Sequence, residues 1–93
     1  MTKAKARHIL VPTKATCEKL KIEIEAGADF TAVAKQHSQC PSGRQGGDLG
    51  EFGPGQMVPE FDTVVFSAEI GKVAGPIQTQ FGYHLIEVTS RTN

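Results

Sequence analysis

The stretch GGDLGEFGPGQMVPEF, residues 46–61, says more about the structure of this protein than any other part of its sequence. Six of the ten glycines of the chain fall between Gly43 and Gly55, and each glycine costs backbone order on folding. A chain of only 93 residues has little stability to lose in this way. We therefore expect a very specific loop or the frame of a site, and the apolar residues Met57 and Phe61 at its end favour a site.

The composition is typical of one globular domain, which we place at residues 1–93. Apolar residues make up 39% of the chain, and ten basic and ten acidic side chains give a formal net charge of zero. This balance gives no indication of a nucleic-acid partner. The apolar run at residues 9–11 is too short for a signal peptide or a membrane span. The sequence predicts a monomeric cytoplasmic protein without a membrane or nucleic-acid partner, or a domain cut from a larger chain.

Two cysteines, Cys17 and Cys40, are too few for a disulfide scaffold and form no CxxC motif. We expect both to be reduced thiols. Cys17 lies where a helix would bury it and is predicted to be a small core residue. Cys40 lies in the polar segment SQCPSGRQGG, where it could act chemically.

Hydrophobic periodicity and turn residues predict both strands and helices. The expected strands are residues 6–11, 49–52, 77–79 and 83–89. The expected helices are residues 13–26, one after the N-cap Asp29, one starting at Pro59, and a short helical turn within the loop 38–47. The expected turns are residues 71–76 and 80–82. Because strands and helices do not alternate regularly, this order predicts an α+β fold with a mostly antiparallel sheet.

Residues 13–26 also fit a strand, because several of their apolar side chains alternate. Fourteen residues without a turn signal favour a helix, which Gly27 would end. The next helix is predicted to present one face formed by Phe30, Val33, Ala34 and His37.

His8 and His84 alternate with apolar residues on the first and last strands, which predicts that both imidazoles lie on the buried face of the sheet. A buried polar group without a partner costs roughly 1–3 kcal/mol. The two histidines are therefore expected to pair with each other or with a hydroxyl such as that of Thr79. A structural role is at least as well supported by the sequence as a direct catalytic role.

Other chemistries are less well supported. The possible metal donors are His8, His37, His84, Cys40 and Asp48, but their spacing matches no compact zinc pattern. Cys40 and a histidine could form a nucleophile and base, yet no oxyanion-loop signature is present. The glycines match no phosphate-binding motif, and Asp48 is better explained as the cap of a turn.

The apolar residues around the glycine-rich stretch are more informative. Met57 and Phe61 are spaced i, i+4 at a helix start, and Leu49 and Phe81 are further candidates. An adaptable methionine and a flat aromatic ring could line a small apolar pocket, although all four could be ordinary core residues. A ring of the size of proline would fit such a pocket.

The chain resembles the parvulin peptidyl-prolyl cis/trans isomerases in their small single-domain form. The matching segments are ARHILV (6–11), GADF (27–30), HSQCPSG (37–43), GGDLGEFGPGQMVPEFD (46–62), VVF (64–66) and GPIQTQFGYHLIEV (75–88). The resemblance implies a four-stranded antiparallel sheet surrounded by about four helices, as in the FKBP-like superfold. It also implies an enzyme that needs no cofactor or metal and that acts on proline-containing polypeptides.

The resemblance further implies roles for particular residues. The proline pocket would consist of Leu49, Met57 and Phe61, with Phe81 as an additional apolar wall. The catalytic group would be the pair His8 and His84, with Thr79 in the same hydrogen-bond network and Cys40 at the edge of the site. Gln56 would contact the substrate backbone.

One departure from the family bears on specificity. Phosphorylation-dependent parvulins carry a basic cluster after the first strand, whereas here the connection PTKAT holds Lys14 as its only cation. We therefore expect no requirement for phosphoserine before the proline. The alternative function is a proline-peptide-binding or chaperone module without catalysis.

Overall fold

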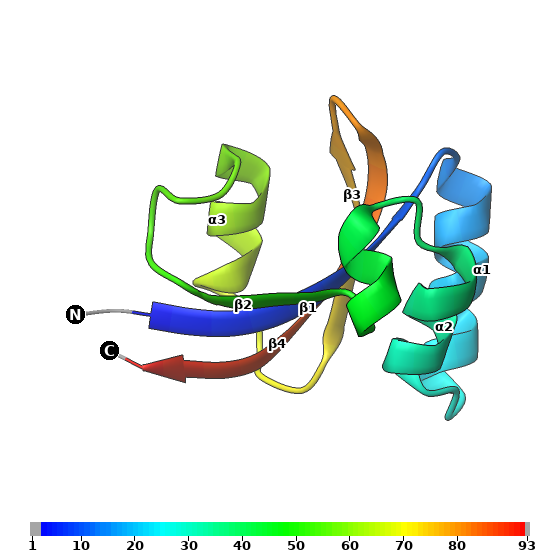
Figure 1. Ribbon diagram of the computed structural model, residues 1–93, viewed down its shortest axis with the longest axis horizontal. Coiled ribbons are helices and arrows are strands. Elements are labelled where there is room, and N and C mark those ends of the chain that lie inside the picture. Colours follow the sequence, from blue (N-terminus) through cyan, green and yellow to red (C-terminus); the bar gives the residue numbers. More distant parts are fainter. Residues whose placement is uncertain (1–2, 93) are drawn as a thin grey trace.

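The computed structural model describes residues 3–92 and, at Ser42, only the backbone. Its strands, β1 (Lys3–Val11), β2 (Asp48–Phe52), β3 (Val73–Thr79) and β4 (Gly82–Thr92), form one antiparallel sheet in the order β2-β1-β4-β3 (Figure 1). Its helices are α1 (Lys14–Glu25), α2 (Phe30–His37), α3 (Pro59–Val65) and the short 3-10 helix η1 (Pro41–Gln45). The α+β class and the four-stranded antiparallel sheet are confirmed. Of the roughly four helices expected, three described ones are α-helices and the fourth is η1.

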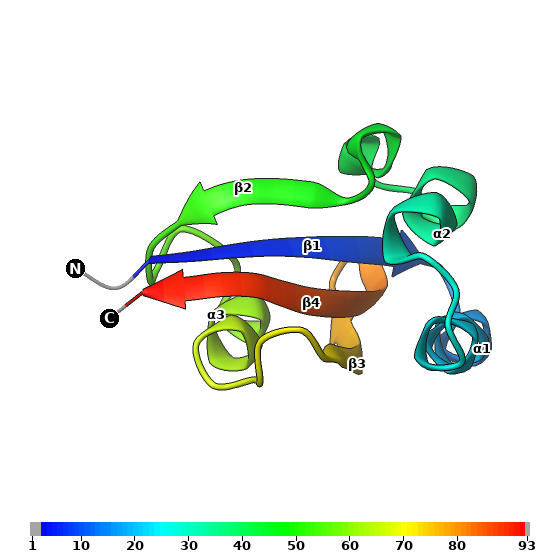
Figure 2. The same cartoon turned by 90° about the horizontal axis from the view of Figure 1, so that it is seen from below.

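Helices cover both faces of the sheet and divide the core into two clusters. On one face Ile9 and Leu85 pack with buried residues of α1 and α2. On the other face Ala6, Ile86 and Val88 pack with buried residues of α3. The division follows from the alternation of side chains along β1 and β4. Figure 2 shows that α3 and the α1–α2 pair lie toward opposite ends of the sheet.

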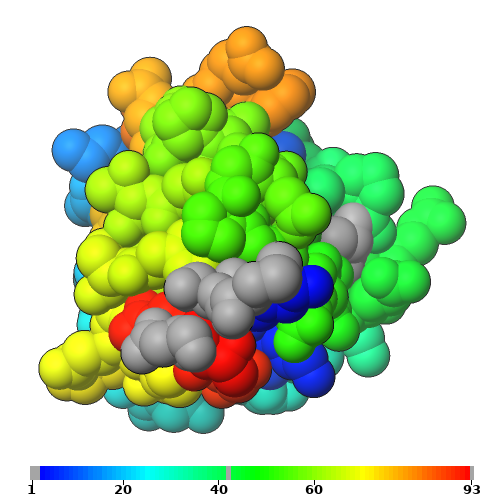
Figure 3. All heavy atoms as spheres, turned by 90° about the vertical axis from the view of Figure 1, so that its left-hand side faces the viewer, coloured from blue at the N-terminus to red at the C-terminus, as the bar shows by residue number. Residues whose placement is uncertain are grey.

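The two central strands place the histidines. β1 and β4 pair along their length, from Lys3 opposite Thr92 at one end to Val11 opposite Tyr83 at the other. His8 is opposite Ile86 and Leu10 is opposite His84, so the two imidazoles are diagonal neighbours on the α3 face. Figure 3 looks onto the end where β1 (blue) and β4 (red) meet, and shows the loop and helix after β2 (green to yellow-green) covering the sheet there.

The helix ends follow local rules. The Thr13 side chain accepts a hydrogen bond from the Thr16 amide at 3.3 Å and caps α1. Gly27, with φ +120°, follows the end of α1 as predicted. Pro59 is the first residue of α3, where the missing amide hydrogen costs no helical hydrogen bond. Asp29 occupies the N-cap of α2, but within the described structure its side chain makes no capping bond.

The prediction that residues 71–76 form a turn and connection is wrong in part, because β3 already begins at Val73. The strand is interrupted by a bulge between Ala74 and Ile77. Pro76 is tolerated there because β3 is an edge strand, where a residue without an amide hydrogen need not break the ladder. Because Gly75 and Pro76 are typical of turns, the sequence pattern does not identify the first half of this strand.

One further expectation is only partly met. In α2, Phe30, Val33 and Ala34 are buried, but His37 is exposed. Cys17 is a fully buried core residue as predicted, and burial raises the pKa of its thiol to about 11.

Within residues 3–92, the longest helix is α1 with 12 residues, and none has the length and apolarity needed to cross a membrane. The ends of the predicted domain 1–93, residues 1, 2 and 93, lie outside the described residues.

Candidate active site

An apolar cavity of about 360 Å³ opens between α3, the start of η1 and the tip of the β3–β4 hairpin. Its wall consists of His8, Leu10, Gln39, Cys40, Pro41, Leu49, Met57, Val58, Phe61, Phe81 and His84. The structure thus brings together all the residues predicted for the site except Thr79 and Gln56. Ligand sites are typically apolar cavities with a few polar groups, and this cavity fits that description.

The histidines form a stacked, hydrogen-bonded pair at this cavity. The Nδ1 atoms of His8 and His84 are 3.2 Å apart, and the two rings lie within 15° of parallel. The hydroxyl of Thr79 lies 2.7 Å from Nε2 of His84, so it belongs to the same network although it does not line the cavity. The expected pairing of the two histidines with each other and with Thr79 is therefore present.

Phe61 joins this pair to the apolar wall. Its ring centroid lies 4.7 Å from that of His84 and 5.4 Å from that of His8, in both cases edge to face. Phe61 is only 5% exposed, so its ring belongs both to the core and to the cavity. A ligand in the cavity would contact the aromatic ring and both imidazoles.

Burial favours the neutral form of both histidines by lowering their pKa values. Burial, and to a lesser extent the charge of His84, lowers the pKa of His8 to about 4. Burial also lowers the pKa of His84, against a smaller opposing effect of the Glu60 carboxylate. Each neutral imidazole has one donor and one acceptor nitrogen. If the Thr79 hydroxyl donates to His84, then Nδ1–H of His84 donates to His8, so the positions of these protons are coupled.

The glycine-rich stretch positions the wall through backbone contacts. Gly47 lies against β1, where a Cβ atom would collide with the His8 carbonyl oxygen, and its own carbonyl accepts a 2.9 Å hydrogen bond from the His8 amide. The Asp48 carboxylate accepts a 2.8 Å bond from the Gly50 amide, so it caps the turn as predicted. These bonds fix β2, which carries Leu49 into the cavity wall.

The side chain of Gln56 is bonded to its own loop. Its side-chain oxygen accepts a 2.7 Å hydrogen bond from the Gly53 amide, and Gln56 is not part of the cavity wall. The neighbouring Gly55 amide donates at 2.7 Å to the carboxylate of Asp62 on α3. Both bonds hold the loop that leads into Met57. A contact between Gln56 and a substrate backbone remains a prediction.

Hydrogen bonds to β1 hold the part of the cavity wall formed by residues 39–41. Ser38 accepts hydrogen bonds from the amides of Leu10 at 3.1 Å and Cys40 at 3.4 Å, and the Gln39 amide donates to the Leu10 carbonyl at 2.7 Å. These contacts place Cys40 at the cavity. Leu10, which alternates with His8 and so shares its face, is a further wall residue that was not predicted. Nothing in the local pattern marks Gln39, Pro41 or Val58, which reach the cavity only through the fold.

A second cavity, of about 710 Å³, is larger but has a different character. It lies at the α1–α2 turn and includes the ion-paired side chains of Arg7 and Glu87 and the charged residues Asp29 and Lys72. None of the predicted site residues belongs to it. We assign the candidate site to the smaller cavity because its walls are apolar and its polar groups converge.

Comparison with known proteins identifies the family of the chain. The rotamase family model, described as a PPIC-type PPIase domain, matches residues 2–90. The foldase protein PrsA of Geobacillus sp. strain WCH70 is 47% identical over 90 residues, which are 96% of this chain and 33% of that protein. The chain therefore spans about a third of the length of such relatives.

Two solved structures extend the comparison. The peptidylprolyl isomerase PrsA of Bacillus anthracis superimposes with a TM-score of 0.95 at 40% identity, over 99% of this chain and 43% of that one. The parvulin NmPin of Nitrosopumilus maritimus superimposes with a TM-score of 0.87 at 33% identity, over 97% of this chain and 98% of that one. The family resemblance is confirmed: the chain belongs to the PPIC-type peptidyl-prolyl isomerases, the parvulins.

Proposed function

We propose that this protein is a peptidyl-prolyl cis/trans isomerase that accelerates rotation about X-Pro bonds in unfolded or flexible polypeptide segments. The observation that carries the proposal is the cavity of about 360 Å³, in which apolar walls meet a neutral, hydrogen-bonded histidine pair. Leu49, Met57 and Phe61 would hold the proline ring, and Phe81, which is 64% exposed at the hairpin tip, would cover it from outside.

The reaction requires no bond to be broken. The barrier to rotation about an amide is about 18–20 kcal/mol, because resonance is lost in the twisted state. Catalysis therefore requires tighter binding of the twisted amide than of either planar isomer. An apolar wall removes water from the carbonyl, whose polar resonance form is then less stabilised. The neutral histidines leave no fixed positive charge to favour that polar form.

The histidine pair is proposed to act by shaping the site. His8 is 4% exposed and His84 is 3% exposed, and their rings are held by each other, by Thr79 and by Phe61. Rings held on several sides keep the base of the cavity rigid, which preserves its shape for the twisted amide.

Cys40 is proposed to tune the electric field near the substrate carbonyl without forming an adduct. Replacing it with alanine or serine is then expected to lower kcat/KM for an X-Pro peptide by about tenfold, which corresponds to one polar interaction of roughly 1–1.5 kcal/mol. Denaturant unfolding of both variants controls for a change in stability. Essentially full activity in both variants would make Cys40 a bystander.

We also propose that the substrate needs no phosphate. Lys14, the cation expected in the connection after β1, lies in the first turn of α1 with its amine 3.9 Å from the Glu18 carboxylate. One exposed lysine that already faces a carboxylate is a poor phosphate clamp. A peptide with serine before proline is expected to be turned over without phosphate, at a rate within about tenfold of that of its phosphorylated twin, the range that one or two exposed ion pairs allow. A far faster reaction of the phosphopeptide contradicts this.

A binding or chaperone function without turnover is the alternative, because the relatives named above include a foldase. Refolding of a test protein with a proline-limited slow phase separates the two. An isomerase at substoichiometric concentration speeds up that phase, which takes roughly 10–100 s without catalysis. A module that only binds leaves the rate of the phase unchanged or slows it.

The organisation as one domain over residues 1–93, the monomeric state and the cytoplasmic location remain proposals. They are supported by the sequence arguments alone. Size-exclusion chromatography with light scattering tests the monomeric state, and a species of twice the expected mass would contradict it.

A further inference from the structure

A basic cavity adjoins the apolar one. It has a volume of about 370 Å³, and its wall consists of Lys35, Ser38, Gln39, Cys40, Pro41, Gly43 and Arg44. Gln39, Cys40 and Pro41 line both cavities, so the two cavities adjoin at one short segment. A ligand that fills the apolar cavity is therefore next to the basic one.

The basic cavity carries positive charge that its own wall does not neutralise. Lys35, in the last turn of α2, and Arg44, in η1, are both exposed, and the wall contains no carboxylate. The ion pairs among residues 3–92 are formed by Arg7, Lys14 and Lys72 and include neither Lys35 nor Arg44. Because the chain has a formal net charge of zero, this is a local excess of positive charge.

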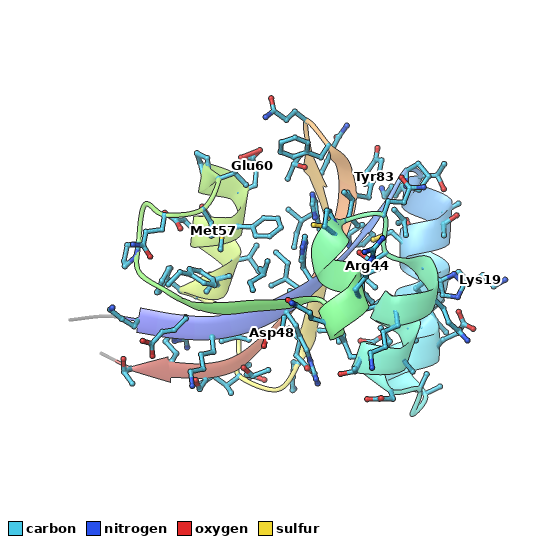
Figure 4. The ribbon with its side chains drawn as sticks, in the orientation of Figure 1. Lys19, Arg44, Asp48, Met57, Glu60 and Tyr83 are labelled. Atoms are coloured by element: carbon cyan, nitrogen blue, oxygen red, sulfur yellow. The ribbon has the colours of Figure 1, made fainter. Side chains whose placement is uncertain are left out.

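The opposite side of the apolar cavity carries the other sign. Figure 4 shows Glu60 on α3 and Arg44 at η1, the two helices between which the apolar cavity opens. The Glu60 carboxylate is close enough to oppose the effect of burial on the pKa of His84. A peptide that lies across the cavity therefore meets negative charge near α3 and positive charge near η1. Such a field orients a charged ligand.

We propose that the basic cavity is a subsite for an acidic side chain of the polypeptide whose proline occupies the apolar cavity. This inference rests on the proposed isomerase function, of which it names the preferred substrate. An extended chain advances about 3.3–3.6 Å per residue, so side chains within roughly three positions of the proline are in reach. The arginine offers a planar fork for a carboxylate and the lysine a mobile point charge.

The test compares peptides that carry glutamate or glutamine at each position from three before to three after the proline. At low salt, glutamate at one of these positions is expected to raise kcat/KM about three- to tenfold over glutamine, in line with two exposed ion pairs. The ratio of kcat/KM for the glutamate peptide to kcat/KM for the glutamine peptide is expected to fall toward one as ionic strength rises. In the double variant Lys35→Gln/Arg44→Gln, the glutamate-to-glutamine ratio is expected to be about one.

The matched control is Lys3→Gln/Lys19→Gln, which removes the same charge from exposed lysines outside both cavities and should keep the ratio. A preference for glutamate that survives in the Lys35→Gln/Arg44→Gln variant overturns the proposal, and so does the absence of a preference at every position. If no peptide is turned over, the isomerase function fails instead. Titration of the same peptides then gives the glutamate-to-glutamine ratio of affinities, with the same expected outcomes.

Discussion

Replacing Phe61 with alanine is expected to abolish most turnover of X-Pro peptides and to lower the free energy of unfolding by about 3–5 kcal/mol. The ring is 5% exposed, and its edge packs against both imidazoles. Removing it leaves a void below the proposed proline pocket and releases one side of the histidine pair. Denaturant unfolding measures the loss of stability, and exchange NMR on a short peptide measures the loss of turnover.

Because the alanine variant could fail to fold, two milder variants keep the prediction testable. Phe61→Leu preserves most of the buried volume, and Met57→Ala truncates a half-buried wall residue. Each is expected to lower kcat/KM by about ten- to thirtyfold, as for the loss of roughly 1.5–2 kcal/mol of apolar contact. Phe66→Leu is the matched control, since Phe66 packs against Phe52 outside the cavity. Wild-type activity in both milder variants contradicts the pocket assignment.

Lowering the pH from 7 toward 4 is expected to destabilise the fold by about 2–3 kcal/mol through His8. The folded-state pKa of His8 is about 4, against 6.5 in an exposed histidine, so the unfolded chain binds the proton more readily in this range. Stability that is fully present above pH 6.5 is then lost progressively as the pH falls toward 4. His84, whose pKa is also lowered by burial, acts in the same direction.

Denaturant unfolding at several pH values and constant ionic strength gives the size of this loss. His37→Gln is the control, because His37 is exposed and lies outside the cavity. The variant is expected to show the same pH dependence as the wild type. An NMR titration reports the imidazole of His8 directly, and the ring should still be neutral at pH 5.5, between the two pKa values. A positively charged His8 at that pH would refute the account.

The parts of the fold that the sequence predicted well are those specified by local patterns. Alternation along β1 and β4 placed His8 and His84 on one face, and Pro59 marked the start of α3. Met57 and Phe61 both line the cavity, although Met57 lies before the first residue of α3. In each case, the residue types within a few positions determine the direction of the side chain.

The parts that the sequence did not predict depend on contacts between distant segments. The first half of β3 was missed because Gly75 and Pro76 are typical of turns, and only its edge position in the sheet explains the strand. Gln39 and Pro41 reach the cavity because Ser38 is held by the amide of Leu10, 28 positions earlier in the chain. The hydrogen bond from the Gly53 amide to the Gln56 side chain is also not marked by any short-range pattern.

The most direct test of the central claim is exchange NMR on a short X-Pro peptide, with and without catalytic amounts of the protein. The method measures the cis-to-trans rate itself and needs no coupled protease. We expect the exchange rate to rise in proportion to the concentration of wild-type protein and to fall sharply with Phe61→Leu. An exchange rate that stays at the uncatalysed value, although the peptide binds in the apolar cavity, would contradict isomerase function.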